Sequence, residues 1–398
     1  MRGDSVYVVD AIRTPFGRYA GALSSVRPDD LLAQIILKVV ERCSVPKDCI
    51  DEVVAGCVGQ AGEDNRNVAR MATLLSGLPV TIPGVTINRL CASSLSALTY
   101  GARTIAAGEA SIIVAAGVES MSRAPYVMAK PNRPYQFGAP EIFDSALGWR
   151  FTNPRFGELY PPISMGETAE NVAARYSISR EEQDLFALNS HKKSIGAWDA
   201  GFFSGHVIPV LAGDNNLVSR DEGPRADTSM EKLAGLKPAF RAGGTVTAGN
   251  SSSLNDGASA AILASEFACQ QYGLEPICRI VATGQAGVDP SYMGIGPIPA
   301  TQVALKRAGW TVESLDKIEI NEAFAAQVLA VIRELGLEET SVNCQGGAIS
   351  IGHPLGASGI RLAASLVQQM RLSSEPCRAL ATACVGVGQG EAILFEKV

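Results

Sequence analysis

Residues 49–54 read Cys-Ile-Asp-Glu-Val-Val, and residues 314–319 read Ser-Leu-Asp-Lys-Ile-Glu, about 265 positions later. Each stretch leads into a predicted strand, and Cys91 and His353 are separated by roughly the same offset. Similarity at one fixed spacing indicates that a structural unit has been duplicated. We therefore predict an α/β protein made of two copies of one strand-and-helix unit.

The first copy alternates short apolar runs with helical patterns. Pro28 opens a helix whose apolar residues recur in pairs every four positions, which marks one buried face. Small residues follow Cys91 and predict a second helix, entered directly from a strand. The predicted strands of this copy are Val6–Asp10, Glu52–Gly56, Thr86–Asn88 and Ile112–Ala116.

The last quarter of the chain repeats this order. We predict a helix at Ala300–Ala308, a turn and helix around His353, and strands at Arg279–Ala282, Lys317–Ile320, Ala379–Cys384 and Glu391–Phe395. In such sheets ligands bind outside the carboxyl ends of the strands. Two related halves would bring the turns at Cys91 and His353 together, so we expect the active site to lie between the halves.

Residues 123–245 differ in character from both copies. Seven prolines fall within their first 40 residues, among several aromatic residues, and exclude a regular sheet there. Ser179 with Glu182 three positions later is a capping box that predicts a helix start, and Gly201 is its predicted stop. We expect an N-terminal half at 1–122 plus 246–273, an inserted loop domain at 123–245 that covers the substrate, and a C-terminal half at 274–398.

Composition narrows the class of protein. With 398 residues, 46% apolar and 19% charged, the chain can bury a large core. A net charge of −6 offers no basic surface, so we expect neither nucleic acid nor membrane as a partner. No run of about 18 apolar residues and no apolar leader predicts a membrane or export segment. The nine cysteines are odd in number and lack Cys-x-x-Cys spacing, which argues against disulfides and a metal and favours the cytoplasm.

Cys91 lies at the predicted turn from a strand into a helix, within Asn-Arg-Leu-Cys-Ala-Ser-Ser-Leu at residues 88–95. Backbone N–H groups at a helix start lower the pKa of a thiol and can bind a developing oxyanion, which suits a nucleophile. A packed, unreactive thiol is the alternative, because free cysteines are commonly buried.

His353 stands in a glycine-rich run at residues 346–359, where glycines permit a tight turn close to a ligand. A structural histidine and a phosphate-cradling loop are the alternatives to a catalytic base. The other two histidines are weaker candidates. His191 stands beside two lysines and is expected on a solvated helix face, and His206 is expected in a loop.

Cys384 opens Cys-Val-Gly-Val-Gly-Gln-Gly at the end of a predicted strand. Such a run leaves N–H groups facing a cleft, beside a second thiol able to carry a proton, although an ordinary turn has the same pattern. Asn321 follows another strand end, where its amide could hold a water. Its alternative role is a helix N-cap.

Together these stretches resemble the thiolase family, in the family's order and over essentially the whole chain. The resemblance implies the thiolase fold, with two duplicated βαβαβαββ halves in a layered α-β-α-β-α arrangement and an inserted loop domain. It also implies a homo-oligomer, a tetramer built as a dimer of dimers. The motifs that carry it are Gly117–Ser122, Asn250–Ala258, Asn321–Phe324, Gly352–Gly356 and the glycine run after Cys384.

The resemblance implies a two-step Claisen chemistry. His353 takes the proton of Cys91, whose thiolate attacks a 3-oxoacyl-CoA, releases acetyl-CoA and keeps the acyl group. Cys384 deprotonates a second CoA, which removes that group; in reverse, Cys384 takes the α-proton of acetyl-CoA. The N–H groups of Cys91 and Gly386 would form one oxyanion hole, and His353 with a water on Asn321 the other.

A coenzyme A site beneath the insert is implied as well. Arg225 matches a family position near the nucleotide, and Ser252 matches one that contacts the pantetheine. No metal or redox cofactor is implied beyond the substrate CoA. The apolar walls match Met165, Leu236, Phe240, Ala248, Ala323 and Phe324.

Three residues depart from the family's usual glycines. Ser94 and Ser253 carry a Cβ into turns that are tight in the family, and Val387 stands in the last glycine run. Ser164 replaces a histidine that many short-chain biosynthetic thiolases have, which argues against acetoacetyl-CoA as the substrate.

Residues 60–70, 148–151 and 384–390 are similar to bacterial 3-oxoadipyl-CoA thiolases of aromatic catabolism, which favours a degradative role. A dicarboxylate acyl chain would need a nearby cation, and the candidates are Arg66, Arg70 and Arg150. A biosynthetic acetoacetyl-CoA thiolase and a non-catalytic acyl-CoA-binding protein remain the alternatives. A 3-ketoacyl synthase would lack a cysteine such as Cys384 in a glycine-rich turn.

Overall fold

Ten of the described strands join in one mixed sheet. The computed structural model describes residues 5–213 and 216–398, so residues 1–4 of the expected N-terminal half and 214–215 of the expected insert lie outside it. The strand order is β4-β3-β5-β10-β1-β11-β14-β13-β12, with β2 paired to β10. The bounds are β1 Val6–Arg13, β2 Gly17–Arg18, β3 Glu52–Gly56, β4 Gly84–Ile87, β5 Ile112–Ser120, β10 Asn255–Ser265, β11 Cys278–Gly287, β12 Lys317–Ile320, β13 Arg378–Val385 and β14 Gln389–Lys397.

The two halves of this sheet share one strand order. In the first half β3 is parallel to β5, and β10 and then β1 follow antiparallel. In the second half β12 is parallel to β13, and β14 and then β11 follow antiparallel. The counterpart of the edge strand β4 shrinks to a single parallel bridge between Ile318 and Val342. The halves meet where β1 pairs with β11 through two residue pairs, so the duplicated α/β architecture is confirmed.

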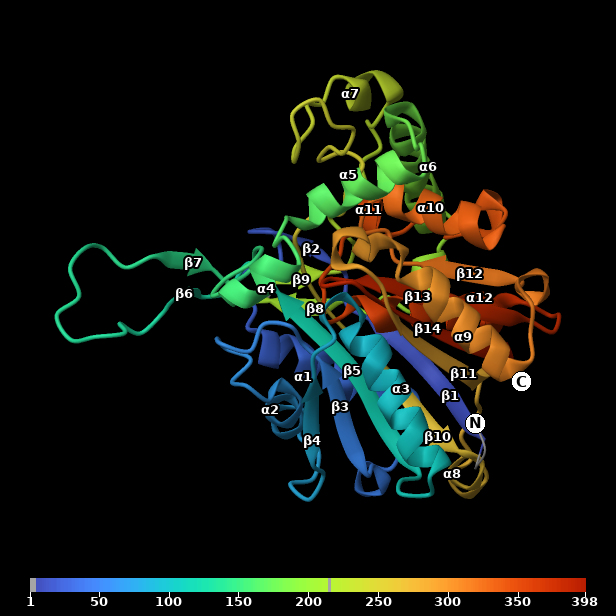
Figure 1. The fold of residues 1–398 in the computed structure, drawn as a ribbon. Helices are drawn as coiled ribbons and strands as arrows, with labels where there is room; N and C mark the ends of the chain where they lie inside the picture. The colour runs from blue at the N-terminus through green and yellow to red at the C-terminus, as the bar shows by residue number, and fades with distance from the viewer. Residues whose placement is uncertain (1–4, 214–215) are drawn as a thin grey trace.

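Helices form three layers around these two half-sheets (Figure 1). The central pair lies between the halves, because one apolar core contains residues of both its helices together with residues of β1, β5, β13 and β14. Residues 358–370 of α12 are all buried, as expected for a helix enclosed on every side. This is the expected α-β-α-β-α arrangement. The central helices are α3 (Ser93–Ala106) and α12 (Ser358–Leu372), and the outer helices are α1 (Pro28–Arg42), α2 (Val68–Leu75), α9 (Pro297–Ala308) and α10 (Ala325–Leu335).

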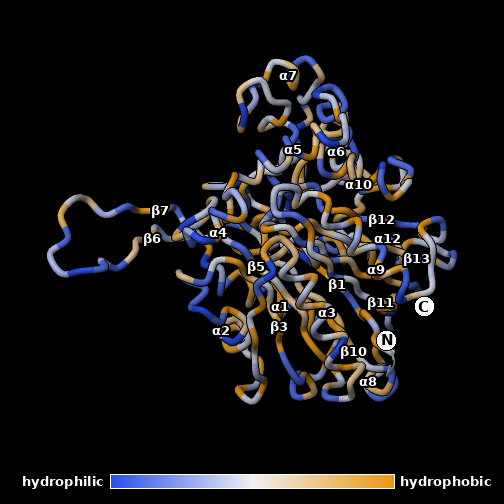
Figure 2. Tube along the Cα trace, viewed as in Figure 1, coloured by the Kyte–Doolittle hydropathy of each residue, from blue (hydrophilic) through white to orange (hydrophobic). Residues whose placement is uncertain are grey.

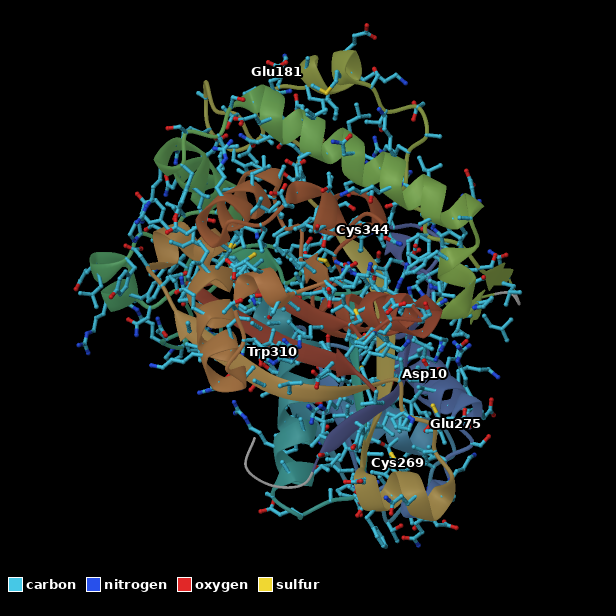
Figure 3. All side chains as sticks on the ribbon, turned by 90° about the vertical axis from the view of Figure 1, so that its right-hand side faces the viewer. Asp10, Glu181, Cys269, Glu275, Trp310 and Cys344 are labelled. Carbon is cyan, nitrogen blue, oxygen red and sulfur yellow. The ribbon has the colours of Figure 1, made fainter. Side chains whose placement is uncertain are left out.

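Hydrophobic residues are concentrated along the sheet and the helices beside it, and hydrophilic residues at the periphery (Figure 2). Two short helices complete the halves, α8 (Glu266–Tyr272) and α11 (Ala348–Ile351). Cys269 on α8 and Glu181 near the start of the long helix of the insert mark opposite ends of the molecule (Figure 3). Among the described residues, no helix is long and apolar enough to cross a membrane.

The insert is built from short elements around one long helix. The capping box of Ser179 and Glu182 is present as predicted, and the helix ends at Asp199, just before Gly201 with φ +75°. β6 and β7 form an arm that projects from the body (Figure 1). The bounds are β6 Tyr126–Met128, β7 Ile142–Asp144, α4 Pro154–Leu159, α5 Met165–Arg175, α6 Arg180–Asp199, β8 Val210–Ala212, β9 Asn216–Val218 and α7 Met230–Ala234.

Candidate active site

Cys91 lies in a single 3-10 turn, Leu90–Ala92, directly before α3. The turn is strained, because Leu90 has φ +45°, a conformation that side chains other than glycine rarely adopt. It is braced from within: the Arg89 N–H donates to Ser93 Oγ at 2.9 Å, and Ser93 Oγ donates to the Leu90 carbonyl at 2.6 Å. Strain held in this way is typical of functional sites and presents the thiol at the start of the helix.

The glycine-rich turn after Cys384 lies against the Cys91 turn, because a Cβ placed on Gly386 would lie 3.1 Å from Leu90 Cδ1. Burial raises the pKa of Cys91 to about 11, although the N–H groups of Gly386 and of Cys91 itself act to lower it. The expectation of a lowered pKa is therefore wrong, because loss of solvation outweighs the two backbone donors. Cys91 is a neutral thiol in the resting protein.

Cys384 is fully buried at the end of β13. Burial and then the nearby Cys91 raise the pKa of the Cys384 thiol well above its ordinary value. Val387, three residues on, has φ +63°, the region where a glycine would sit without strain and a β-branched residue rarely does. The turn after Cys384 is thus held in a costly conformation beside the Cys91 turn.

His353 is held by three hydrogen bonds that reach it from separate segments. Its backbone N–H donates to Asn255 Oδ1 at 2.9 Å, its Nδ1 is 2.6 Å from Ser358 Oγ, and its Nε2 is 3.2 Å from Asn321 Nδ2. Ser358 Oγ also donates its single proton to the Pro354 carbonyl at 2.8 Å, so it accepts from the N–H of His353 Nδ1. This assignment leaves Nε2 as the basic nitrogen.

Burial first, and then the charge of the nearby Arg361, lower the pKa of His353 to about 3. The imidazole is therefore neutral and able to accept a proton. Asn321 is not the N-cap of α10, because Phe324 holds that position, and its amide faces His353 instead. Ser358 and Arg361 were not singled out in the sequence; their place within the first helical turn after His353 was the available signal.

One buried carboxylate at the site was also not singled out in the sequence. Glu119, at the end of β5, accepts the N–H groups of Val58, Gly59 and Gly356 at 2.9–3.1 Å. Burial raises the pKa of Glu119 to about 7. It joins the loop after β3 to the loop that follows His353, and so connects the two halves at the site.

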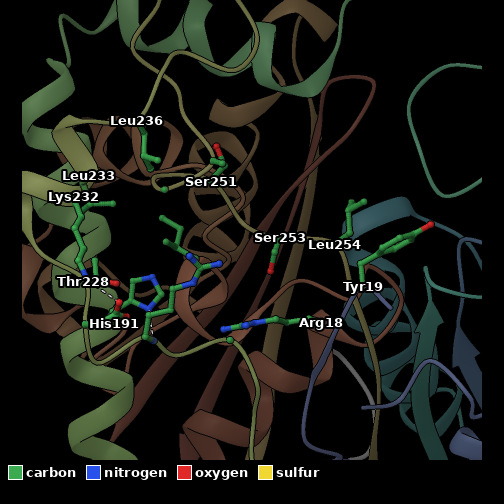
Figure 4. A pocket seen from close by; sticks show the side chains of 16 residues that line it. Arg18, Tyr19, His191, Thr228, Lys232, Leu233, Leu236, Ser251, Ser253 and Leu254 are labelled. Atoms are coloured by element: carbon green, nitrogen blue, oxygen red, sulfur yellow. Dashed lines mark hydrogen bonds and ion pairs between the residues drawn. The ribbon is translucent and has the colours of Figure 1, made fainter. Parts of the chain in front are cut away.

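A pocket of about 390 Å³ lies under the insert (Figure 4). Of the residues expected at coenzyme A, Arg225, Leu236 and Ala248 line it. Ser252 does not, although its neighbours Ser251 and Ser253 do; its N–H donates to the Ala323 carbonyl at 3.0 Å.

Cationic side chains gather in this pocket. Arg18, Arg225 and Lys232 come from three separate segments, and Figure 4 shows Arg18 and Lys232 on different sides of it. His191 also lines the pocket, and its Nδ1 accepts the N–H of Arg225 at 3.1 Å. The prediction of a solvated His191 is wrong: the residue is only 6% exposed, because the loop at Arg225 covers that face of α6. Burial first, and then Arg225 and Arg18, lower the pKa of His191 to about 4.

The remaining expected wall residues gather elsewhere. They form one small apolar cluster with Cys384, and the rings of Phe240 and Phe324 meet edge to face with centroids 6.1 Å apart. A Cβ placed on Gly386 would lie 3.6 Å from the Met165 sulfur, so this cluster borders the glycine turn. The cluster contains Met165, Ala323 and Phe324, with Phe240 packed against Phe324.

Two of the three departures from glycine are accommodated by hydrogen bonds. Ser94 lies in α3 with helical geometry, and its Oγ accepts the N–H of Ile360 at 3.0 Å, at the start of α12. Ser253 Oγ donates to Asn255 Oδ1 at 2.8 Å, the atom that also accepts from His353. Both serines therefore tie site segments together, whereas Val387 remains strained.

The described residues contain no group of three or more His, Cys, Asp or Glu side chains that could hold a metal ion. All nine cysteines are unpaired. The Cys91 and Cys384 turns offer two thiols and backbone N–H groups, and His353 with Asn321 offers one neutral imidazole and one amide. These groups together are a set suited to acyl transfer through a thioester.

Comparison with known proteins identifies one family over nearly the whole chain. Residues 6–267 match the model of the thiolase N-terminal domain, and residues 274–397 match that of the thiolase C-terminal domain. A 3-oxoadipyl-CoA/3-oxo-5,6-dehydrosuberyl-CoA thiolase of Escherichia coli (strain K12) is 51% identical over 98% of this chain and 99% of its own. Among solved structures, the acetyl-CoA acetyltransferase of Bacillus anthracis covers 100% of both chains with a TM-score of 0.94 and 40% identity.

Human mitochondrial 3-ketoacyl-CoA thiolase, solved in complex with CoA, matches with a TM-score of 0.93 and 39% identity over 99% of this chain and 98% of its own. Fold, sequence and the chemistry of the site agree. The chain belongs to the thiolase family, the acyltransferases that cleave a 3-oxoacyl-CoA with CoA into acetyl-CoA and a shortened acyl-CoA, or run that Claisen chemistry in reverse.

Proposed function

We propose that this thiolase works in the degradative direction on a 3-oxo-dicarboxylyl-CoA such as 3-oxoadipyl-CoA, with Cys91 as the nucleophile. The observation that carries the assignment of roles is the close approach of Gly386 to Leu90, 3.1 Å from a Cβ placed on Gly386 to Leu90 Cδ1, since it brings the two cysteine turns together at one point. The substrate assignment is supported by the 51% identical E. coli enzyme, which acts on 3-oxoadipyl-CoA by its name.

In the first half-reaction His353 Nε2 takes the proton of Cys91 as the thiolate attacks the 3-oxo carbonyl. The carbon–carbon bond breaks, the acyl group stays on Cys91, and the departing enolate of acetyl-CoA takes a proton from Cys384. A neutral Cys91 thiol and a neutral His353 imidazole suit this step, because the proton then moves only when the substrate is in place. The tautomer fixed by Ser358 supports His353 as the base.

In the second half-reaction Cys384, now a thiolate, removes the proton of an incoming CoA thiol. The CoA thiolate attacks the acyl group on Cys91 and the shortened acyl-CoA leaves, while the Cys91 sulfur, released as a thiolate, takes back its proton from His353 Nε2. The N–H groups of Cys91 and Gly386 bind the oxyanion of the tetrahedral intermediates, while His353 and a water on Asn321 bind the enolate oxygen. The geometry of Asn321 beside His353 supports the second hole.

In this proposal coenzyme A binds in the pocket beneath the insert. Its phosphates would lie near Arg18, Arg225 and Lys232, which supply positive charge in a protein of net charge −6. The pantetheine would pass Ser252 and Ala248 towards the apolar cluster at Cys384. The expected boundaries of the three units, with 123–245 as the covering insert, belong to this proposal.

Arg150 is the best of the three cations considered for the distal carboxylate. Arg70 gives both terminal nitrogens to the Ile82 and Val80 carbonyls, whereas within the described chain Arg150 gives only Nη1, to the Ser145 carbonyl at 3.2 Å. Trp149, next to Arg150, donates to the Ile163 carbonyl at 2.8 Å, two residues before Met165 of the site cluster. Arg150→Met should raise KM for 3-oxoadipyl-CoA at least about tenfold while KM for acetoacetyl-CoA is unchanged, and Arg66→Met serves as the matched control.

We further propose a cytoplasmic homotetramer. The arm carries apolar side chains that are almost fully exposed, including Tyr135 at 98% and Phe137 at 100%, and such side chains support contact with another copy. Nine unpaired cysteines support a reducing compartment. Light scattering after size exclusion tests the assembly, and a monodisperse monomer would contradict it.

The test is CoA-dependent cleavage of 3-oxoadipyl-CoA, acetoacetyl-CoA and a medium-chain 3-oxoacyl-CoA, followed by intact mass of the protein. We expect an acyl adduct on Cys91, loss of that adduct in Cys91→Ser, and the highest kcat/KM for 3-oxoadipyl-CoA. Preference for acetoacetyl-CoA would support the biosynthetic alternative. Binding without turnover of any of the three would support the non-catalytic one.

A further inference from the structure

Glu391 is a fully buried carboxylate that the reaction above does not use. It lies on β14 opposite Ala383 of β13, next to the pair formed by Cys384 and Gly390. Its own carbonyl accepts from Thr382 Oγ1 at 2.8 Å, so its backbone is fixed in the hairpin that carries Cys384. The side chain leaves this hairpin and reaches the other half of the molecule.

Its partners lie on the helix that carries Cys91 at its start. Ser96 Oγ and Thr99 Oγ1 of α3 both donate to the carboxylate, Thr99 at 2.8 Å, and these hydroxyl-bearing residues are at most 6% exposed. Gln285 of β11 donates from the other side at 3.0 Å. The carboxylate therefore bridges the helix of one half and two strands of the other.

One cation completes the cluster and belongs to the Cys91 turn itself. The Nε of Arg89 is 3.3 Å from Glu391 Oε2 and donates to Ser96 Oγ at 2.7 Å. Arg89 also begins the internal bracing of the turn through its N–H to Ser93. Arg89, two residues before Cys91, is thus tied to Glu391, which lies one residue pair along the hairpin from Cys384.

A carboxylate in this position is costly for stability alone. Burying a charge loses its solvation, and hydrophobic residues of similar size commonly replace buried ion pairs without loss of stability. Strand β14 is otherwise apolar on its buried stretch, where Ala392, Ile393 and Leu394 follow. What the buried carboxylate provides is a fixed geometry. Four donors from three segments converge on it, and together they define how the helix sits against the hairpin.

We infer that Glu391 is a positioning residue that sets the Cys91 turn against the Cys384 hairpin through Arg89, Ser96 and Thr99. The inference rests on the proposed roles of the two cysteines. Acyl transfer on Cys91 and proton transfer on Cys384 require the two sulfur atoms to keep a fixed relative position. A shift of about 1 Å is enough to slow such chemistry by up to a hundredfold. The strained turns at Leu90 and Val387 are the segments that this link holds together.

The experiment compares thiolysis, which needs both cysteines, with alkylation of Cys91 by iodoacetamide, which needs only one. Glu391→Leu should lower kcat at least about tenfold while KM for CoA and the Cys91 alkylation rate stay within about threefold. Glu391→Gln should lie between this variant and the wild type, since its amide oxygen still accepts from one hydroxyl. The alkylation rate is read from the mass of the Cys91 peptide.

The same link is tested from the helix side by Ser96→Ala with Thr99→Val. This pair should lower kcat as Glu391→Leu does, and adding it to Glu391→Leu should lower kcat no further, because residues acting through one contact are not additive. If Glu391→Leu does not fold, the kcat of the Ser96→Ala with Thr99→Val variant alone tests the inference. Additive losses, or unchanged kcat in folded variants, would overturn the inference.

Asp10→Asn is the matched control. Asp10, labelled in Figure 3, is a buried carboxylate that also joins the two halves, through Arg42 at 2.5 Å and Arg371 at 2.7 Å. Among the described residues, its side-chain partners lie outside both cysteine turns. It should lower the unfolding temperature and leave kcat unchanged; a parallel fall in kcat would reduce Glu391 to a stability role. A wild type that forms no adduct on Cys91 would instead reject the proposed function, so the two failures are distinct.

Discussion

Arg361 Nη2 lies 3.4 Å from Oδ1 of Asn321, inside the core and behind the catalytic turn. A guanidinium can only donate, so the atom that faces it is the amide oxygen, and the amide nitrogen is left facing His353. Glu319 holds Arg361 in place at 3.1 Å. The orientation of Asn321 is thus set by a buried ion pair rather than by the substrate.

The first prediction concerns this orientation. Asn321→Asp keeps the shape of the side chain but replaces its only donor with an acceptor, so kcat should fall about a hundredfold or more, and Asn321→Ala should fall by a similar factor. Steady-state thiolysis with KM measured beside kcat checks this. The Cys91 alkylation rate is the control and should not change. Equal activity of Asn321→Asp and wild type would show that no donor is needed there.

The second prediction is the pH dependence of Cys91 reactivity. A thiol with a pKa of about 11 gains thiolate tenfold per pH unit below that pKa, and the His353 imidazole is neutral above pH about 3. Alkylation of Cys91 in the free enzyme should therefore rise about a hundredfold between pH 7 and 9. Peptide mass after timed iodoacetamide treatment measures it. A flat rate over this range would instead indicate a preformed thiolate–imidazolium pair.

Much of the fold follows from local patterns in the sequence. β3 and β12 begin and end at the predicted residues, because each is a short apolar run bounded by turn residues. The capping box at Ser179 also fixes its helix start. β5 was placed too short, since its last residues, Gly117–Ser120, carry no continuous apolar signal, although pairing with β10 keeps them in the sheet.

The site was less predictable where burial decides the outcome. The sequence indicated backbone donors at Cys91, but not the loss of solvation that outweighs them. His191 has a polar local sequence, and only the loop at Arg225, far along the chain, buries it. Glu391 stands in an apolar strand pattern whose meaning depends on a helix from the other half. Such contacts between distant segments have no local signature.

The third prediction concerns the strained turn after Cys384. Val387 with φ +63° costs about 1–2 kcal/mol, and it is 38% exposed, so less buried surface is lost on removing its side chain than at a core position. Val387→Gly should therefore raise the free energy of unfolding by up to about 1 kcal/mol, after the entropy cost of glycine. Urea unfolding checks this. Val385→Gly, at a buried strand position with ordinary geometry, is the control and should lower stability; a loss in both variants would contradict the strain argument.

The last prediction concerns His206 and acid stability. His206 is 1% exposed, and among the described residues neither ring nitrogen has a hydrogen-bond partner. Burial first, and then the charges of Arg13, Arg371, Arg42 and Arg361, lower the pKa of His206 well below its ordinary value. The folded state therefore holds a neutral ring while the unfolded chain takes up a proton below pH about 6.5, so stability is lost as the pH falls.

His206→Phe removes this titration and keeps an aromatic ring beside Phe202 and Phe203, whose centroids lie 5.3 and 5.6 Å from that of His206. The difference in unfolding free energy between pH 7.5 and 5.5 should shrink by about 1.4 kcal/mol relative to the wild type. Urea unfolding at the two pH values measures it, and using the difference cancels any packing cost of the larger ring. An unchanged difference would mean that His206 is protonated, or becomes solvated, in the folded state, since only a neutral buried ring makes folding depend on pH with this sign.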